Sequence, residues 1–187
     1  MPLITTPIPD LLVVESMVFE DSRGYFFESY NEAVFAAEGL HYRFVQDNQA
    51  KSSYGVIRGL HYQLAPHAQT KLLRVLSGSI LDVAVDIRKG SPTYGQVYAI
   101  ELTDTNRLQL LVPKGFAHGY SVLSETAEVL YKCDAFYHKE SEGGIAWNDP
   151  TLAINWRIPA DKAIISEKDQ HHPGISHCLN NFIYEPS

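Results

Sequence analysis

The sequence predicts an all-β fold of the sandwich or barrel type, and two patterns support this prediction. Residues 80–88 alternate in polarity, so that four aliphatic side chains fall on one face of a strand and two Asp and one Arg on the other. Short apolar segments follow at 97–102, 108–112 and 128–133, and turn residues separate several of them. Many short strands with turns between them are typical of a sandwich or barrel.

The 187 residues suit one domain, predicted over 1–187, because no repeat, charge block or low-complexity linker divides them. One helix is expected near the start, where Asn31 can cap residues 33–38 and Gly39 can end them. The segment after Trp147 contains four prolines and is expected to be irregular, with short helical or extended pieces.

The formal charge is −7, from 22 acidic against 15 basic residues. This balance argues against nucleic acid or an anionic membrane as the main partner. A small phosphorylated ligand remains compatible with it, because a few clustered Arg and Lys side chains are enough to bind one.

The expected location is the cytoplasm. Cys133 and Cys178 form no CxxC pair and no metal-finger spacing, which favours two reduced thiols. The longest apolar run near the start, residues 11–14, is too short for a signal peptide. No stretch approaches the roughly 20 apolar residues of a membrane helix.

Segment 55–63, predicted as a strand, carries the first candidate for chemistry. Strand alternation would place Ile57, Gly59, His61 and Gln63 on one face. His61 alone indicates little, because a lone His beside apolar neighbours is usually a hydrogen-bonded core residue.

Two further strands carry polar side chains on apolar faces. Lys71 shares a face with Leu73 and Val75, so it either reaches solvent or meets an anion. Tyr131 is expected to point inward, where its hydroxyl serves a structural hydrogen bond or donates a proton.

The segment 19–28 is expected to form a hairpin with a turn at 21–24. Residue types alone favour a polar hairpin tip over contacts of Arg23 and Glu28 with a ligand. Residues 164–169 would by themselves be taken for a surface loop.

The segment Pro-Lys-Gly-Phe-Ala-His at 113–118 is similar to the second motif of the cupin barrels, in which the His binds metal. In metal-binding cupins its partners are a His-x-His and a Glu seven residues before a Gly. Here the first motif ends in Gln63, and Lys71 stands seven residues before Gly78. Gln is a poor ligand for a transition metal, and Lys puts a positive charge where the cation would sit. The sequence therefore predicts a pocket with no metal.

Taken together, the motifs resemble the dTDP-4-dehydrorhamnose 3,5-epimerase family of cupins over about residues 18–169. The markers stand in the order 19–28, 46–48, 55–63, 69–71, 82–86, 91–93, 113–118, Tyr131, 147–150 and 166–169. The resemblance implies a cupin-like double-stranded β-helix, which is a jelly-roll barrel, with a few short peripheral helices. It also implies a homodimer, with N-terminal strands exchanged between subunits. Three positions depart from the pattern, namely Gln49, Ala50 and Phe136, and none of them removes a catalytic candidate.

The resemblance also implies a role for each marker residue. His61 would be the general base, oriented by Asp169; Tyr131 would be the general acid on the opposite face of the sugar; and Lys71 would lie beside the 4-keto oxygen. Eight residues would bind the nucleotide, its pyrophosphate or the sugar: Arg23, Glu28, Gln46, Asn48, Arg58, His118, Glu142 and Lys168.

The implied reaction converts dTDP-4-keto-6-deoxy-D-glucose to dTDP-4-keto-L-rhamnose, in dTDP-L-rhamnose biosynthesis. A 4-keto group makes the hydrogens on carbons 3 and 5 acidic, so one carbonyl can serve two inversions. Histidine suits the base and a nearby cation suits the enolate. No hydride is transferred, so no cofactor is expected, and no GxGxxG fingerprint follows a strand.

Other functions stay open at this stage. A single-site 3- or 5-epimerase, or a 3,4-ketoisomerase, would share the fold and the substrate class. A metal-dependent cupin is disfavoured by Gln63 and Lys71. A sugar-binding barrel without catalysis would leave a set of four residues unexplained: His61, Asp169, Tyr131 and Lys71.

Overall fold

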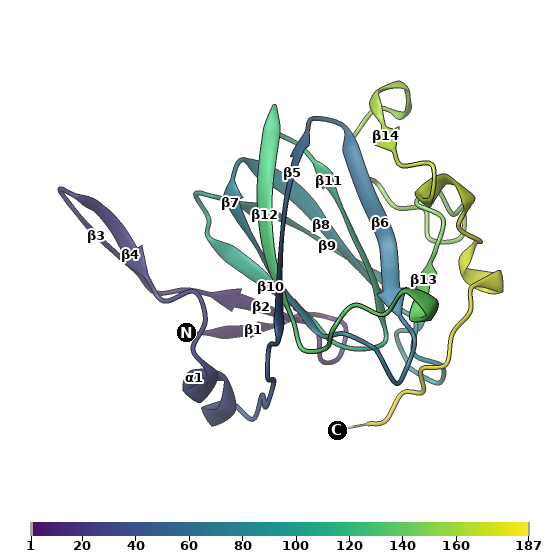
Figure 1. Ribbon diagram of the computed structural model, residues 1–187, viewed down its shortest axis with the longest axis horizontal. Coiled ribbons are helices and arrows are strands. Elements are labelled where there is room, and N and C mark those ends of the chain that lie inside the picture. Colours follow the sequence, from purple (N-terminus) through teal and green to yellow (C-terminus); the bar gives the residue numbers. More distant parts are fainter. Residues whose placement is uncertain (1, 187) are drawn as a thin grey trace.

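The structure, a computed structural model, describes residues 2–186. Within this range, two six-stranded sheets face each other around a shared interior (Figure 1). The first sheet has the order β1 (Leu3–Thr5), β2 (Leu12–Glu15), β10 (Leu108–Val112), β7 (Lys71–Ser77), β12 (Thr126–Cys133) and β5 (Gln46–Ser53). The second has the order β13 (Glu142–Gly144), β6 (Val56–Gln63), β11 (Phe116–Val122), β8 (Ser79–Asp86) and β9 (Val97–Thr103), and β14 (Ile164–Ile165) pairs in parallel with β6.

An aliphatic core lies between the two sheets at one end of the barrel. Leu73 of β7 and Leu110 of β10 meet Ile80 and Ala84 of β8, and each of these side chains is fully buried. Complete burial of such a Leu or Ile side chain stabilises the fold by about 1.5–3 kcal/mol. The predicted all-β fold is confirmed, and its form is the expected jelly-roll barrel.

The alternation predicted for 80–88 is also confirmed. Leu81, Val83 and Val85 pack on the outer side of the second sheet, beneath the C-terminal segment. The polar side chains of the other face are buried too, because this face points into the barrel or is covered by loops. Asp82 and Asp86 have no exposed surface and are held by hydrogen bonds.

The prediction that Ile57 and His61 share one face of the strand is wrong, because the alternation of faces changes at Gly59. Ile57 packs in the outer cluster with Leu60 and Tyr62, whereas His61 lines the interior. The register between β6 and β11 shifts at this point, so the alternation moves by one residue. Gly59 permits the shift because its φ is +123° and a Cβ there would lie 2.6 Å from the Cα of Gly119.

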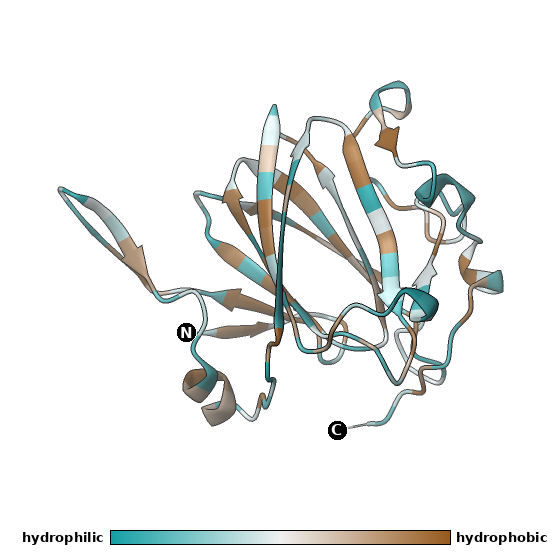
Figure 2. Ribbon diagram, in the orientation of Figure 1, coloured by the Kyte–Doolittle hydropathy of each residue, from teal (hydrophilic) through white to brown (hydrophobic). Residues whose placement is uncertain are grey.

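The predicted helix is confirmed as α1 (Glu32–Ala37), and the Asn31 side chain accepts hydrogen bonds from two of its first N–H groups. The predicted hairpin is formed by β3 (Val18–Asp21) and β4 (Gly24–Phe27). It extends away from the barrel (Figure 1) and carries apolar residues near its base (Figure 2). Its Phe19 and Phe26 side chains are exposed.

The C-terminal segment is irregular, as predicted, and covers the outer face of the second sheet (Figure 1). Trp156, Ile175 and Phe182 pack there against the aliphatic face of β8. Short 3-10 helices punctuate the segment at Ala160–Lys162, Asp169–His171 and Ile175–His177, and another lies at Lys139–Ser141. Among residues 2–186, no helix is long and apolar enough to cross a membrane.

Candidate active site

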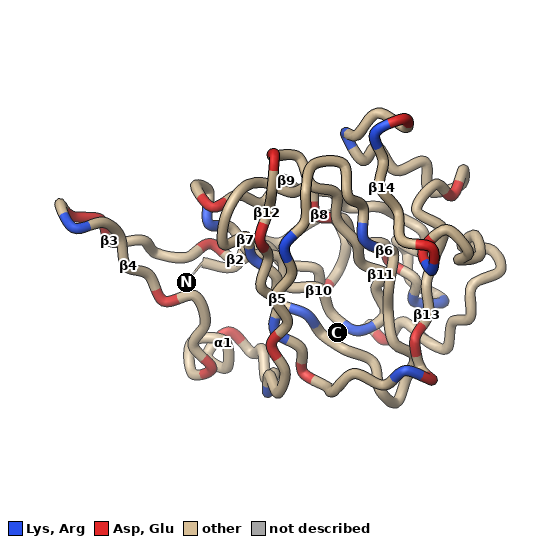
Figure 3. The backbone as a smooth tube through the Cα atoms, turned by 45° about the horizontal axis from the view of Figure 1, so that its top comes forward, with Lys and Arg blue, Asp and Glu red and all other residues tan. Residues whose placement is uncertain are grey.

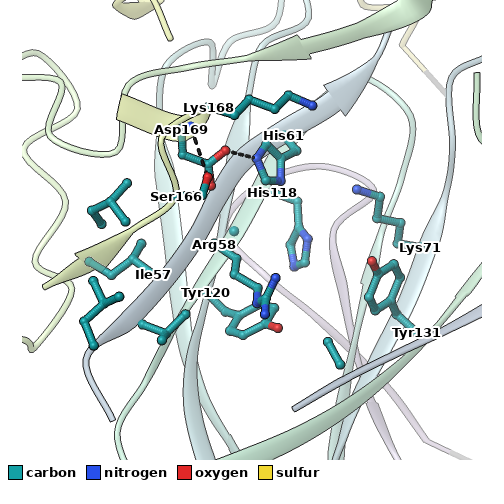
Figure 4. A pocket seen from close by; sticks show the side chains of 15 residues that line it. Ile57, Arg58, His61, Lys71, His118, Tyr120, Tyr131, Ser166, Lys168 and Asp169 are labelled. Atoms are coloured by element: carbon teal, nitrogen blue, oxygen red, sulfur yellow. Dashed lines mark hydrogen bonds and ion pairs between the residues drawn. The ribbon is translucent and has the colours of Figure 1, made fainter. Parts of the chain in front are cut away.

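A cavity of about 480 Å³ lies between the two sheets, beside the aliphatic core, and a second hollow of about 390 Å³ adjoins it. His61, Lys71 and Tyr131 line both (Figure 4). Ten of the twelve residues predicted for the site lie in one or both hollows: His61, Lys71, Tyr131, Asp169, Arg58, His118, Lys168, Gln46, Asn48 and Glu142.

The His61 and Asp169 side chains form a pair at the cavity wall. The Nε2 of His61 lies 2.7 Å from Oδ1 of Asp169, and the other carboxylate oxygen accepts the N–H of Gly59 at 3.2 Å. Burial would raise the pKa of Asp169, but the hydrogen bonds that its carboxylate accepts from His61 and from Gly59 hold the pKa below its usual value. An ionised carboxylate can only accept hydrogen bonds, so Nε2 carries the proton and Nδ1 has the free lone pair.

The contact between Asp169 and His61 joins two segments that lie 108 residues apart in the sequence. The parallel pairing of β14 with β6 brings the 166–169 turn over the barrel mouth. The backbone N–H of Asp169 then donates to the Ser166 hydroxyl at 3.2 Å, which fixes the turn. A segment that resembles a surface loop in sequence is thus part of the cavity wall.

Lys71 and Tyr131 project into the cavity from the sheet opposite His61 (Figure 4). They come from the neighbouring strands β7 and β12, and neither side chain forms a hydrogen bond or ion pair within residues 2–186. Burial lowers the pKa of Lys71 and raises that of Tyr131. The Tyr131 phenol therefore keeps its proton at neutral pH, and an anion beside Lys71 would favour the charged form of the lysine.

Polar side chains extend the site on both sides of this centre. Arg58 donates to the Ser52 hydroxyl at 3.0 Å, and Nε2 of the buried His118 lies 2.7 Å from Oδ1 of Asp82. Sequence analysis missed Asp82 as the partner of His118. It also missed Tyr120, which lines the cavity two residues after His118 and could have been found from that spacing.

At the second hollow, the predicted binding residues hold one another in place. Gln46 donates its side-chain amide to Asn48 at 3.1 Å, and Lys168 pairs with Glu142 at 2.5 Å. Burial would raise the pKa of Glu142, but the contact with Lys168 holds it below its usual value.

The cupin metal position is occupied by side chains that do not suit a metal. The amide of Gln63 binds backbone, donating to the His67 carbonyl at 2.6 Å and accepting the His138 N–H at 2.7 Å. Because the amide is committed to the backbone and Lys71 supplies an ammonium, the donor set does not fit a cupin metal.

Arg23 and Glu28 do not reach the cavity of their own chain. Arg23 lies at the tip of the β3–β4 hairpin, exposed and paired with Asp21 at 2.5 Å (Figure 3). Glu28 follows the same hairpin and borders a separate surface hollow with Phe26. The reason is geometric, since the hairpin extends away from the barrel of its own chain (Figure 1).

The arrangement can move protons at a carbon beside a carbonyl. The His61 imidazole, paired with the Asp169 carboxylate, lies on one side of the cavity, and the Tyr131 phenol and the Lys71 amino group lie on the other. This is the set that removal of a proton, stabilisation of an enolate and return of a proton require.

Comparisons with known proteins agree with this chemistry. The family model described as dTDP-4-dehydrorhamnose 3,5-epimerase matches residues 5–177. The enzyme of that name from Shigella flexneri is 51% identical over 170 residues, covering 90% of this chain and 93% of its own length. The crystal structure of the Elizabethkingia anophelis NUHP1 enzyme has a TM-score of 0.90 at 54% identity, with 94% of this chain and 97% of that chain covered.

A third relative was solved with a sugar nucleotide. The Legionella pneumophila dTDP-6-deoxy-D-glucose-3,5-epimerase, in complex with dTDP-4-keto-L-rhamnose, has a TM-score of 0.90 at 44% identity, covering 94% of this chain and 93% of that chain. The match extends over almost the whole chain and through every element of the cavity. The chain therefore belongs to the dTDP-4-dehydrorhamnose 3,5-epimerase family.

Proposed function

We propose that this protein is a cofactor-independent epimerase that inverts carbons 3 and 5 of dTDP-4-keto-6-deoxy-D-glucose to give dTDP-4-keto-L-rhamnose. The observation that carries the proposal is the His61–Asp169 pair facing Lys71 and Tyr131 across one cavity. The names of the relatives supply the substrate class, and the geometry supplies the acid, the base and the cation.

The reaction begins at Nδ1 of His61, which takes the proton from the carbon beside the keto group. Asp169 accepts the hydrogen bond from Nε2 and stabilises the imidazolium that forms, as a carboxylate does in a catalytic triad. Such general base catalysis contributes about 10²–10⁴ in rate. The electrons move onto the keto oxygen as the enolate develops.

Lys71 stabilises this enolate oxygen. Removal of one such preorganised donor typically costs about 10²–10³ in kcat. Tyr131 then returns a proton from the opposite side of the ring, which inverts the carbon. Its raised pKa keeps the phenol protonated until the enolate needs it. The same groups can serve the second carbon, because both carbons neighbour one ketone, once His61 has released its proton to solvent and Tyr131 has regained one from it.

The remaining cavity residues bind the nucleotide diphosphate and the sugar. Arg58 and Lys168 offer positive charge to the pyrophosphate, within a chain that is acidic overall. His118 and Glu142 offer hydrogen bonds, and Gln46 and Asn48 line the second hollow.

We further propose a homodimer in which each β3–β4 hairpin reaches the cavity of the partner subunit. The hairpin exposes Phe19 and Phe26, whose exposed fractions are 59% and 70%, and exposed apolar surface of this kind marks an interface. Such a dimer would bring Arg23 and Glu28 to a substrate. The free thiols Cys133 and Cys178 fit a reducing compartment, which favours the cytoplasm.

The test is incubation of the protein with dTDP-4-keto-6-deoxyglucose in D₂O, without added metal or cofactor, followed by NMR at carbons 3 and 5. A coupled reductase traps any L-rhamno product. We expect deuterium at both carbons and dTDP-L-rhamnose in the trap.

Other outcomes would redirect the proposal. Deuterium at only one carbon would keep the acid–base mechanism and identify a single-site epimerase. A folded protein that incorporates none would refute epimerisation of this substrate. The 3,4-ketoisomerase would then be tested by following the position of the carbonyl.

A further inference from the structure

His172 lies behind the catalytic pair and has no part in the mechanism above. Its Nε2 is 3.5 Å from Oδ1 of Asp169, and its ring meets the His61 ring edge-on with centroids 5.7 Å apart. This Nε2 is buried without a hydrogen-bond partner among residues 2–186. A buried imidazole nitrogen without a partner is uncommon and calls for an explanation.

The position of His172 is fixed by the surrounding backbone. A Cβ on Gly144 would lie 2.4 Å from the His172 ring, so only glycine leaves room for it. Pro173 follows the ring, and its carbonyl accepts the N–H of Ala146 at 2.8 Å. The side chain of His172 is only 14% exposed. The ring is therefore held against the catalytic pair by its packing.

We propose that His61, Asp169 and His172 form a binding site for a divalent transition-metal ion of the Zn²⁺ type, and that the bound ion inhibits the enzyme. One nitrogen or oxygen donor from each residue lies within 4.8 Å of the other two. Two imidazoles and one carboxylate are a donor set that Zn²⁺ accepts, with a fourth position left for water.

The two separations that involve Asp169 can be compared with those around a bound ion, and the third, between the two imidazoles, is within 4.8 Å. Donors bound tetrahedrally at ~2.0–2.1 Å from Zn²⁺ lie ~3.4 Å apart. The 3.5 Å between Asp169 and His172 already matches this spacing. The 2.7 Å between Asp169 and His61 must lengthen by ~0.7 Å, so the ion replaces the hydrogen bond of the catalytic pair.

Inhibition follows from the proton of His61. A neutral imidazole that binds a metal through Nε2 carries its single proton on Nδ1. The proton that Nε2 shares with Asp169 therefore moves to Nδ1, and no net proton is released. Nδ1 is the atom assigned to take the substrate proton, so the base is blocked while the rest of the cavity remains intact. The inhibition argument rests on the proposed function, whereas the ion site does not.

The test compares His172→Gln with His171→Gln in the full chain, freed of metal with a chelator that is then removed. His171 is the matched control, because it is exposed and its Nδ1 contacts the Glu167 carbonyl at 2.6 Å. Zn²⁺ affinity is measured by competition with a chromophoric chelator, without substrate. We expect one ion per wild-type chain, unchanged affinity in His171→Gln, and affinity lower by roughly tenfold or more in His172→Gln.

Two further measurements use the same proteins. Co²⁺ added to the wild type should give the visible absorption of a four-coordinate site, which His172→Gln should lose. Zn²⁺ should slow the exchange of substrate protons for deuterium in the wild type and in His171→Gln. Each rate is compared with the metal-free rate of the same protein. Addition of a chelator should restore the metal-free rate.

Equal Zn²⁺ affinity in the two variants, or no binding by the wild type, would overturn the proposal. Equal inhibition of the two variants by Zn²⁺ would also overturn it, because the ion would then act elsewhere. Ion binding requires no turnover, so a protein that binds Zn²⁺ through His172 but never epimerises the sugar would refute the proposed function and keep the site.

Discussion

At the scale of single residues, the cavity holds two polar groups that the fold itself does not use. Lys71 and Tyr131 lie in a mostly apolar barrel without a hydrogen bond or ion pair among residues 2–186. Both side chains are partly buried, and they line the open cavity without contacting a polar partner from the described part of the chain. Such groups are explained when a ligand supplies the missing partner, here a keto oxygen for the ammonium and a ring carbon for the phenol proton.

Tyr131→Phe should separate the removal of a proton from its return. The variant keeps the ring and His61, so exchange of the substrate proton with D₂O should continue, while the inverted product should form about 10²–10⁴ times more slowly. NMR of the recovered substrate and a product trap measure the two rates on one sample. Equal loss of exchange and of product would show that Tyr131 does not donate the returning proton.

Asp169 should make the stability of the protein depend on acid pH. Its pKa is lower in the folded chain than the ordinary value of 3.8, so the ionised form stabilises the fold above that value. This contribution is lost as the pH falls through the lowered pKa of the folded state. Urea unfolding from pH 6 downward should therefore show a shallower decline for Asp169→Asn than for the wild type.

Asp161→Asn provides the control for this measurement, because Asp161 is exposed and the charge change is the same. Asp86 and Asp149 also have lowered pKa values, so part of the decline persists in every variant. If the two variants lose stability in parallel with the wild type, Asp169 does not contribute to the acid dependence.

At the scale of elements, strand faces were predictable wherever the pattern is local. The alternation of 80–88 correctly places Leu81 and Val83 on one side. The ends of α1 are visible in the sequence as the N-cap Asn31 and as Gly39, which follows the C-cap Glu38. The face of His61 was not predictable, because the register shift at Gly59 depends on its contact with Gly119, sixty residues later in the chain.

The site could be predicted only in part, and for a similar reason. The His61–Asp169 hydrogen bond joins positions 108 residues apart, so no local pattern reveals it, and the family resemblance supplied it. No marker pointed to His172, because its packing depends on Gly144 and on the path of the C-terminal segment. Arg23 and Glu28 were predicted at the site but lie away from the cavity of their own chain. The sequence of one chain does not reveal what the hairpin contacts, so this outcome was not predictable.

Gly59→Ala should test whether the shift in β6 positions the base. The new Cβ would lie 2.6 Å from the Cα of Gly119 and 2.7 Å from the carbonyl oxygen of His118, both of which are backbone atoms. Gly24→Ala is the matched control, because its φ of +130° is close to the +123° of Gly59 and nothing lies within 4 Å. The two substitutions share the backbone strain, so their difference measures the collision.

We expect Gly59→Ala to lower the free energy of unfolding by about 1–3 kcal/mol more than Gly24→Ala does. It should also lower kcat, because His61 follows two residues later. Chemical denaturation and steady-state rates measure both effects. Equal stability in the two variants, together with a wild-type kcat in Gly59→Ala, would show that the close approach of β6 to β11 is unimportant.

At the scale of the whole molecule, Arg88 ties the two ends of the chain to the barrel. Its guanidinium pairs with Asp86 at 2.9 Å and with Asp10 at 2.5 Å, and it lies over the rings of Phe116 and Tyr184. The N-terminal loop, β8, β11 and the C-terminal segment meet at this one side chain. The β3–β4 hairpin is held by another arginine: Arg107, in the turn between β9 and β10, pairs with Glu20 at 2.8 Å and lies over the Tyr25 ring. Phe19 and Phe26 remain exposed and available to a second subunit.

The proposed dimer predicts that two inactive variants restore each other. One variant is His61→Asn, which removes the base, and the other is Arg23→Ala combined with Glu28→Ala, which removes the hairpin contacts. If each hairpin serves the partner's cavity, a mixed dimer holds one cavity with an intact base and an intact hairpin. Random mixing of equal amounts makes half of the dimers mixed, so about a quarter of the wild-type activity should return.

The variants are unfolded and refolded together, and separately refolded samples mixed afterwards are the control. Light scattering confirms that the species is a dimer, and a coupled reductase measures turnover. If the hairpin served its own cavity, the mixed dimer would contain no intact site and the activity would stay at the level of the controls. A monomer in light scattering would remove the dimer itself, and Arg23 and Glu28 would then need no role at the cavity.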